Sequence, residues 1–119
     1  MREKRRYDRL PTRGFMDCAV DFSLNDRRYT NIPVLSLSAG GAYIAIETER
    51  DNLTKGDRLC GIRFSIEILN GMLMDGIIVH KMSLGEVGGC GIEFCDVPAL
   101  TRASLDTFVH HKLMEFGLE

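Results

Sequence analysis

Apolar and polar residues alternate with a period of two over most of the chain, which predicts β-strands rather than helices. The alternation recurs in six segments separated by stretches rich in turn-forming residues. The predicted strands cover residues 15–22, 29–37, 42–47, 58–69, 72–82 and 90–94. Because their connections are short, we expect an antiparallel sheet, and six short strands of this kind tend to close into a small barrel.

Two local signals refine this picture. Pro33 lies inside the second segment, and proline cannot donate to a strand ladder, so that strand is expected at an edge or at a bulge. Asn70 and Gly71 separate the fourth and fifth segments, and an Asn-Gly pair between alternating runs is a strong signal for a two-residue hairpin turn.

The period changes after Pro98, which suits the first turn of a helix. The apolar residues beyond it are spaced for one helix face: Leu105, Phe108, Val109, Leu113 and Phe116. The sequence therefore predicts an all-β fold with one C-terminal helix. We expect a single domain with a flexible basic N-terminal arm over 1–14, a six-stranded antiparallel barrel over 15–96 and the helix over 97–117.

Charge is distributed unevenly along the chain, whose net charge is −2. Residues 2–13 carry six basic side chains against Glu3 and Asp8, so this arm is +4 and the remainder is −6. A basic arm on an acidic body favours contact with a localised anion and argues against a protein that coats DNA.

Length and composition exclude several classes of protein. The 119 residues suit one domain with one core. No apolar stretch approaches a membrane span or a secretory signal, so we expect a cytoplasmic protein without membrane insertion. The four cysteines have no C-x-x-C spacing and lie in apolar runs, which predicts buried or half-buried thiols, no disulfide and no metal site: Cys18, Cys60, Cys90 and Cys95.

Two short motifs carry the candidate chemistry. Arg5 and Arg9 have the spacing R-x-x-x-R, and arginine can bind phosphate or the O6/N7 edge of guanine with two hydrogen bonds. Ser36 and Ser38 point to the same face of their strand, and Gly41 follows at its end. Taken separately, the arginine motif is more typical of a solvated tail than of a ligand site, and the serine–glycine motif is more typical of a strand turn or bulge.

Together the motifs resemble the PilZ domain family, and the resemblance covers nearly the whole chain. In that family R-x-x-x-R and a later [D/N]-x-S-x-x-G bind cyclic di-GMP, a bacterial second messenger, on the outside of a six-stranded barrel. The sequence GIEF over 91–94 matches the last strand of the family. The resemblance implies a ligand site made by Arg5, Arg9, Ser36, Ser38 and Gly41, with Arg6 and Gly40 as further candidates.

This sequence departs from the family at Ser36, where the motif has Asp or Asn. A serine hydroxyl reaches less far than a carboxylate and carries no charge, and losing one charge-assisted hydrogen bond costs about 1.5–3 kcal/mol. The departure leaves two functions open: a cyclic di-GMP receptor that signals through an unidentified effector protein, or a degenerate PilZ domain that acts as a protein-interaction adaptor.

We do not expect the protein to be an enzyme. We also expect no cofactor and no direct binding to DNA. No arrangement of nucleophile and base can be recognised in the sequence. His80 lies in an apolar strand and is interpreted as a core histidine, whereas His110 and His111 lie on the helix and are expected to be solvated.

Overall fold

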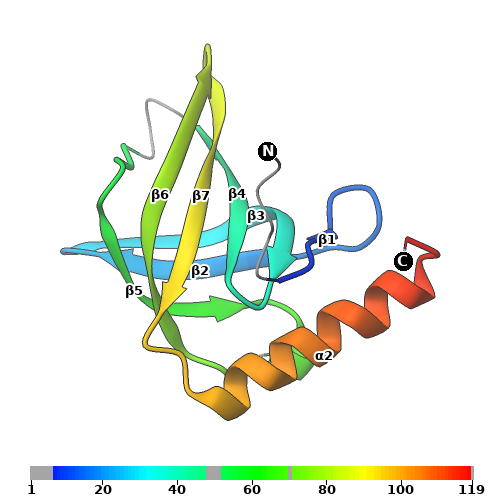
Figure 1. Ribbon diagram of the computed structural model, residues 1–119. Coiled ribbons are helices and arrows are strands. Elements are labelled where there is room, and N and C mark those ends of the chain that lie inside the picture. The colour runs from blue at the N-terminus through cyan, green and yellow to red at the C-terminus, as the bar shows by residue number, and fades with distance from the viewer. Residues whose placement is uncertain (1–6, 48–51, 70, 119) are drawn as a thin grey trace, which may run out of the picture.

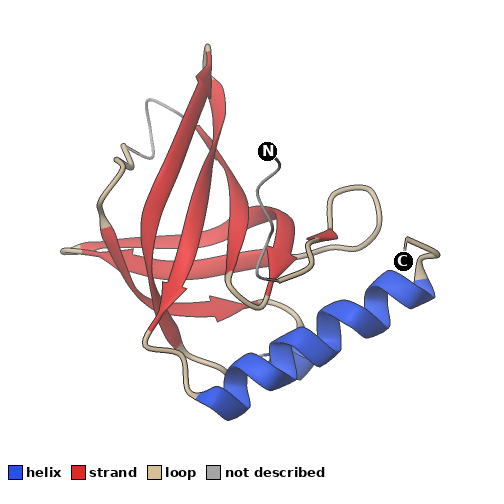
Figure 2. Ribbon diagram, in the orientation of Figure 1, coloured by secondary structure: helices blue, strands red, loops and turns tan. Residues whose placement is uncertain are grey.

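The computed structural model describes residues 7–47, 52–69 and 71–118 (Figure 1). Its elements are β1 (Leu10–Pro11), β2 (Ala19–Leu24), β3 (Arg27–Ser38), β4 (Gly41–Glu47), β5 (Arg58–Phe64), the 3₁₀ helix η1 (Glu67–Leu69), β6 (Met74–Leu84), β7 (Val87–Cys95) and α2 (Ala99–Glu115). Figure 2 shows a β-structure with one long helix beside it.

The strands form a closed antiparallel barrel. Their order is β1-β3-β2-β5-β6-β7-β4, and an additional pairing of β3 with β4 closes the ring of six long strands. Closure removes the exposed edges that an open sheet would present. The six-stranded barrel and the C-terminal helix predicted from the sequence are thereby confirmed.

Strand β3 is bulged, as Pro33 predicted, and it is not an edge strand because it pairs with β2 and β4. One irregularity lies opposite Asp21, whose carboxylate accepts a hydrogen bond from the backbone N–H of Asn31 at 2.8 Å. Asn31 has a positive φ of 55°, which asparagine tolerates better than most residues. A second irregularity lies between Val34 and Ser36, at the start of the serine motif.

The strand boundaries differ most from the prediction in two places. Strand β2 begins at Ala19 rather than at Phe15, because residues 13–16 form a turn. Strand β5 ends at Phe64, and residues 65–73 form a longer connection that contains η1. The expected two-residue hairpin at Asn70–Gly71 is therefore wrong, although Asn70 itself lies outside the described residues.

The packed part of the molecule begins before the predicted barrel. Leu10 and Thr12 are fully buried, and the Thr12 hydroxyl donates a hydrogen bond to the carbonyl of Val34 at 2.6 Å. In β1, Leu10 and Pro11 pair with Leu37 and Ser36 of β3. The second half of the predicted arm, from residue 7, is thus part of the folded structure.

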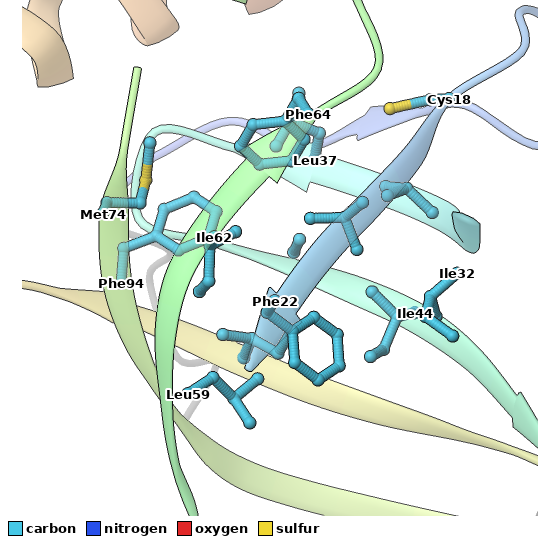
Figure 3. Packing of buried hydrophobic residues seen from close by; sticks show 14 of the residues in the cluster. Cys18, Phe22, Ile32, Leu37, Ile44, Leu59, Ile62, Phe64, Met74 and Phe94 are labelled. Atoms are coloured by element: carbon cyan, nitrogen blue, oxygen red, sulfur yellow. The ribbon is translucent and has the colours of Figure 1, made fainter. Parts of the chain in front are cut away.

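The inward faces of the strands make one continuous hydrophobic core (Figure 3). Phe64 and Phe94 meet edge to face with ring centroids 5.9 Å apart, and Phe22 stacks on Tyr29 at 5.0 Å. Each buried aromatic or aliphatic side chain of this size contributes about 1.5–3 kcal/mol of transfer free energy. Helix α2 buries four of the five residues predicted for its inner face, which are Leu105, Phe108, Val109 and Leu113, and it contacts β1 and β3. The fifth, Phe116, is the C-cap residue and is only partly buried.

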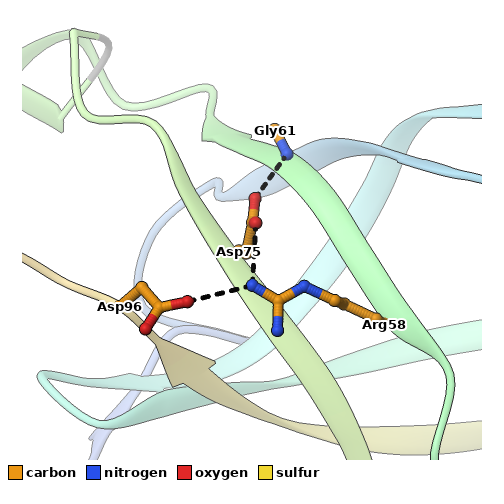
Figure 4. A network of polar contacts seen from close by, with 4 residues as sticks. All are labelled: Arg58, Gly61, Asp75 and Asp96. Carbon is orange, nitrogen blue, oxygen red and sulfur yellow. Dashed lines mark hydrogen bonds and ion pairs between the residues drawn. The ribbon is translucent and has the colours of Figure 1, made fainter.

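A polar network fixes the point where the chain leaves the barrel for α2 (Figure 4). Arg58 of β5 donates hydrogen bonds to Asp96 at 3.0 Å and to Asp75 of β6 at 3.1 Å. The other oxygen of Asp75 accepts a hydrogen bond from the backbone N–H of Gly61 at 3.2 Å. These bonds raise the pKa of Arg58 above its usual value, and the bond to Asp96 has a larger effect than the bond to Asp75.

Candidate functional site

A cavity of about 640 Å³ lies on the outside of the barrel, against β3, β4, β6 and β7. Five of the seven residues predicted as a ligand site line it: Arg9, Ser36, Ser38, Gly40 and Gly41. The other lining residues are Leu37, Ala42, Tyr43, Val79, His80, Met82, Gly91, Ile92 and Glu93. The structure thus brings Arg9 together with the serine–glycine motif, about 30 residues further along the chain, whereas Arg5 and Arg6 lie outside the described residues.

Ser38 shapes the turn between β3 and β4. Its hydroxyl oxygen accepts hydrogen bonds from the backbone N–H groups of Gly40 and Gly41, both at 3.2 Å. The same hydroxyl lies 3.4 Å from the carbonyl oxygen of Gly41, to which it donates. A serine side chain that bonds to the backbone two and three residues ahead stabilises a tight turn. Ser38 is therefore a structural element of the cavity as well as one of its lining residues.

Gly41 is glycine because two strands approach closely. A Cβ at this position would lie 2.0 Å from the carbonyl oxygen of Ile92 on β7. Gly41 pairs with Glu93 in the ladder, and the N–H of Phe94 donates to the carbonyl of Gly40 at 2.9 Å. The absence of a side chain thus serves the contact between β4 and β7.

Gly40 has a different neighbour, the ring of Tyr7. A Cβ on Gly40 would lie 2.8 Å from Cδ2 of Tyr7, so the ring packs directly on the glycine. Tyr7 stands between the two arginines of R-x-x-x-R. Its hydroxyl accepts a hydrogen bond from Nη1 of Arg102 on α2 at 3.2 Å, and the guanidinium carbon lies 5.4 Å from the ring centroid.

Asp8 makes a second contact between this segment and the helix. Its carboxylate lies 2.9 Å from Nε2 of His110, which also lies 4.0 Å from Asp106. Arg9 is exposed, and it follows Tyr7 and Asp8 and precedes the buried Leu10. The segment is therefore anchored on both sides of Arg9, which itself lines the cavity. The expectation that His110 is merely solvated is corrected by this contact.

The sequence did not identify these anchors as part of the site. Tyr7 is the one residue of 2–9 that is aromatic rather than charged. This difference was the only sign in the sequence that it packs against the barrel. The partners on α2, Arg102 and His110, carry no such signal because their role depends on how the helix packs against β1 and β3.

His80 also belongs to the cavity, and the interpretation of it as a core histidine is wrong. A register shift between Ile78 and His80 interrupts the alternation on β6, so Val79 and His80 are both exposed. Such a bulge redirects a side chain relative to its strand. The His80 ring then lies 6.3 Å from the ring of Tyr43, across Gly91 of β7.

Glycines leave room for these rings on the outer face of the barrel. A Cβ on Gly89 would lie 2.5 Å from Cε2 of Tyr43, so the ring rests against the backbone of β7. A Cβ on Gly91 would lie 3.3 Å from Cβ of His80. The cavity therefore combines a cation from the N-terminal segment with serine hydroxyls and two exposed or half-exposed rings, which suits a ligand with anionic and aromatic parts.

The family model of the PilZ domain matches residues 3–111. The chain belongs to the PilZ domain family. The matched range includes both arginines of R-x-x-x-R, the serine–glycine motif and most of α2. The resemblance recognised from the motifs is thus confirmed for the family, and no curated protein sequence matches the chain significantly.

Solved PilZ structures share the fold of this PilZ domain at low sequence identity. The PilZ domain of YcgR from Escherichia coli, solved with c-di-GMP, has a TM-score of 0.74 at 18% identity, with 96% of this chain and 95% of that one covered. The complex of K. pneumonia MrkH with c-di-GMP has a TM-score of 0.80 at 13% identity and 97% coverage of this chain. The Bacillus subtilis inhibitor of motility MotI/DgrA has a TM-score of 0.69 at 15% identity and 95% coverage.

The chain spans about half of two of these proteins, 55% of MrkH and 53% of MotI/DgrA. Within the described part of the PilZ domain, no helix has the length and apolar character needed to cross a membrane. The described residues also contain no group of three or more side chains suited to hold a metal ion.

Proposed function

We propose that this PilZ domain is a receptor for cyclic di-GMP that binds the nucleotide in the cavity on the outside of its barrel. The observation that carries the proposal is the convergence of Arg9 with Ser36, Ser38, Gly40 and Gly41 on one cavity. Two structural relatives, the PilZ domain of YcgR and MrkH, were solved with c-di-GMP, which supports the same chemistry here.

The ligand's two phosphates and two guanines match the two kinds of group in the cavity. The guanidinium of Arg9 can bind a phosphate oxygen pair or the O6/N7 edge of guanine with two charge-assisted hydrogen bonds. Arg5 and Arg6 are proposed to join Arg9 at the ligand, because they belong to the same short basic segment. Tyr7, the residue that directly follows Arg6, packs on Gly40 beside the cavity.

The domain is proposed to signal through a partner protein rather than by catalysis. PilZ domains are receptor and adaptor modules, and we expect a bacterial, cytoplasmic setting in which the nucleotide is available. Binding would bring the arginine side chains onto the nucleotide and change the surface that a partner meets, a known kind of switch. The alternative, an adaptor without nucleotide binding, is supported only by Ser36, and the nucleotide-bound relatives do not favour it.

Isothermal titration of the chain with cyclic di-GMP tests the proposal. We expect saturable binding that Arg9→Ala weakens by about 10- to 150-fold, since one charge-assisted contact is lost. Arg63→Ala is the matched control, because Arg63 is an exposed arginine of β5 that does not line the cavity. In the strand ladder it lies opposite Asp21 of β2. Absence of binding by the unaltered chain, or equal affinity of the Arg9→Ala and Arg63→Ala variants, would contradict the proposal.

A further inference from the structure

Glu93 is an exposed carboxylate in the lining of the candidate site. It lies on β7 between the buried residues Ile92 and Phe94, so its side chain points outward. It pairs across the ladder with Gly41, which in turn pairs with Ser38 on β3. Because neighbouring strands are about 4.8 Å apart, Glu93 stands about 10 Å from Ser38 along one row of the sheet.

Nothing bulky separates Glu93 from Ser38 within that row, since Gly41 has no side chain. No other described residue makes a hydrogen bond or an ion pair with the Glu93 carboxylate. It is also the only acidic residue among those that line the cavity. The site therefore offers an uncommitted anionic acceptor in the same cavity as the guanidinium of Arg9.

A carboxylate in a site for a phosphodiester has a restricted use. It repels the phosphates, so the part of the nucleotide that meets it must carry hydrogen-bond donors instead. The N1–H and N2–H groups of guanine are two such donors, side by side on one edge, and the two oxygens of a carboxylate can accept from both. Adenine presents an acceptor at N1, so its edge does not match.

The serine at position 36 gives Glu93 a possible role that is particular to this chain. Ser36 occupies the place at which the family motif has an acidic or amide side chain, and its row of the sheet runs from Ser36 to Tyr43 and Gly91. Glu93 lies in the adjacent row, two residues along β7 from Gly91. A carboxylate lost from β3 is thus available on the same face of the barrel, two strands away.

We propose that Glu93 recognises the guanine base of the bound nucleotide and supplies the acceptor that Ser36 lacks. This inference rests on the proposed function and refines it, because Glu93 would set the preference for guanine over adenine. Arg9 would bind the charged backbone of the ligand, and Glu93 would read the base.

Titrations with cyclic di-GMP and cyclic di-AMP test the inference. We expect Glu93→Gln to weaken cyclic di-GMP binding about 10- to 150-fold, as for the loss of a charge-assisted hydrogen bond, without weakening cyclic di-AMP binding. Glu86→Gln is the matched control, since Glu86 lies in the exposed turn between β6 and β7 and does not line the cavity. It removes the same charge and should leave both affinities within about twofold.

A second variant tests whether the missing acceptor can be returned to β3. Adding Ser36→Asp to Glu93→Gln should recover part of the cyclic di-GMP affinity, and thermal unfolding of each variant verifies that the barrel is intact. An unchanged ratio of the two affinities in Glu93→Gln would overturn the role of Glu93 while leaving the proposed function in place. Failure of the unaltered chain to bind cyclic di-GMP would overturn both.

Discussion

The hydroxyl of Tyr7 and the guanidinium of Arg102 lie 95 residues apart in sequence and are joined by a hydrogen bond of 3.2 Å. Tyr7 stands between the motif arginines, and Arg102 lies on α2. The bond therefore connects the segment that carries Arg9 to the helix near the other end of the chain. The carboxylate of Asp8 and Nε2 of His110 join the same two elements at 2.9 Å.

The Tyr7–Arg102 bond should contribute measurably to stability. We expect Tyr7→Phe, which keeps the ring on Gly40, to lower the free energy of unfolding by about 0.5–1.5 kcal/mol, the net value of one intramolecular hydrogen bond. A double-mutant cycle with Arg102→Met, followed by urea denaturation, isolates the coupling between the two side chains. The same cycle with Arg63→Met should give no coupling, and an equal value in both cycles would show that the bond does not form.

The two glycines of the β3–β4 turn should respond differently to alanine. Gly41→Ala places a methyl group 2.0 Å from a backbone carbonyl oxygen, which cannot move without separating β4 from β7. We expect a loss of about 1–3 kcal/mol or more in the free energy of unfolding, as for overpacking of a tight site. Urea denaturation of the purified variant measures this loss.

Gly40→Ala is the informative comparison, because its methyl group would meet the ring of Tyr7 rather than a strand. The ring can move away, so the loss of stability should be smaller than for Gly41→Ala. The displaced Tyr7 should instead shift the neighbouring Arg9 and weaken cyclic di-GMP binding. Equal losses of stability in the two variants would show that the ring of Tyr7 is as immovable as the backbone.

The cysteines should differ sharply in reactivity. Burial raises the pKa of the Cys18 thiol to about 11, so about one thiolate in a thousand is present at pH 8. Cys60 is exposed on β5, contrary to the expectation that every thiol is at least half-buried, and it should react with a disulfide reagent first. Cys60→Ser should remove the fast phase, and Cys18 should react only as the pH rises towards 11 or the chain unfolds.

The raised pKa of Cys18 also makes the free energy of unfolding depend on pH. A thiol whose pKa is higher in the folded than in the unfolded chain favours folding while it is protonated. The contribution of Cys18 is therefore complete below pH 9 and is lost as the pH rises towards 11. Rapid modification of Cys18 at pH 8 in the native chain would contradict the burial on which this argument depends.

Regular elements of the fold were predictable from local patterns. The alternation in β4 and the helical spacing of Leu105, Phe108, Val109 and Leu113 correspond directly to their buried faces. The end of β5 was not predictable, because Ile66 and Leu69 continue an apolar pattern that fits a strand and a 3₁₀ turn equally well. The bulge at Val79 was not predictable either, because one extra residue in a strand does not change the local composition.

The candidate site was predictable as far as its motifs were local. Arg9 and the serine–glycine residues were identified, and the structure places them around one cavity. Glu93 and Tyr43 could not be assigned to it from the sequence, because the register between β4 and β7 brings them there. Tyr7 and Arg102 likewise meet only through the packing of α2, which depends on contacts distant in sequence.

The pairing of β1 with β3 has a consequence for how this segment can vary. Leu10 is buried opposite Leu37, and Arg9 precedes it directly. Inserting or deleting one residue between Leu10 and Thr12 would exchange the inward and outward faces of the strand. The number of residues between Arg9 and the barrel wall is therefore fixed by the register of this short strand.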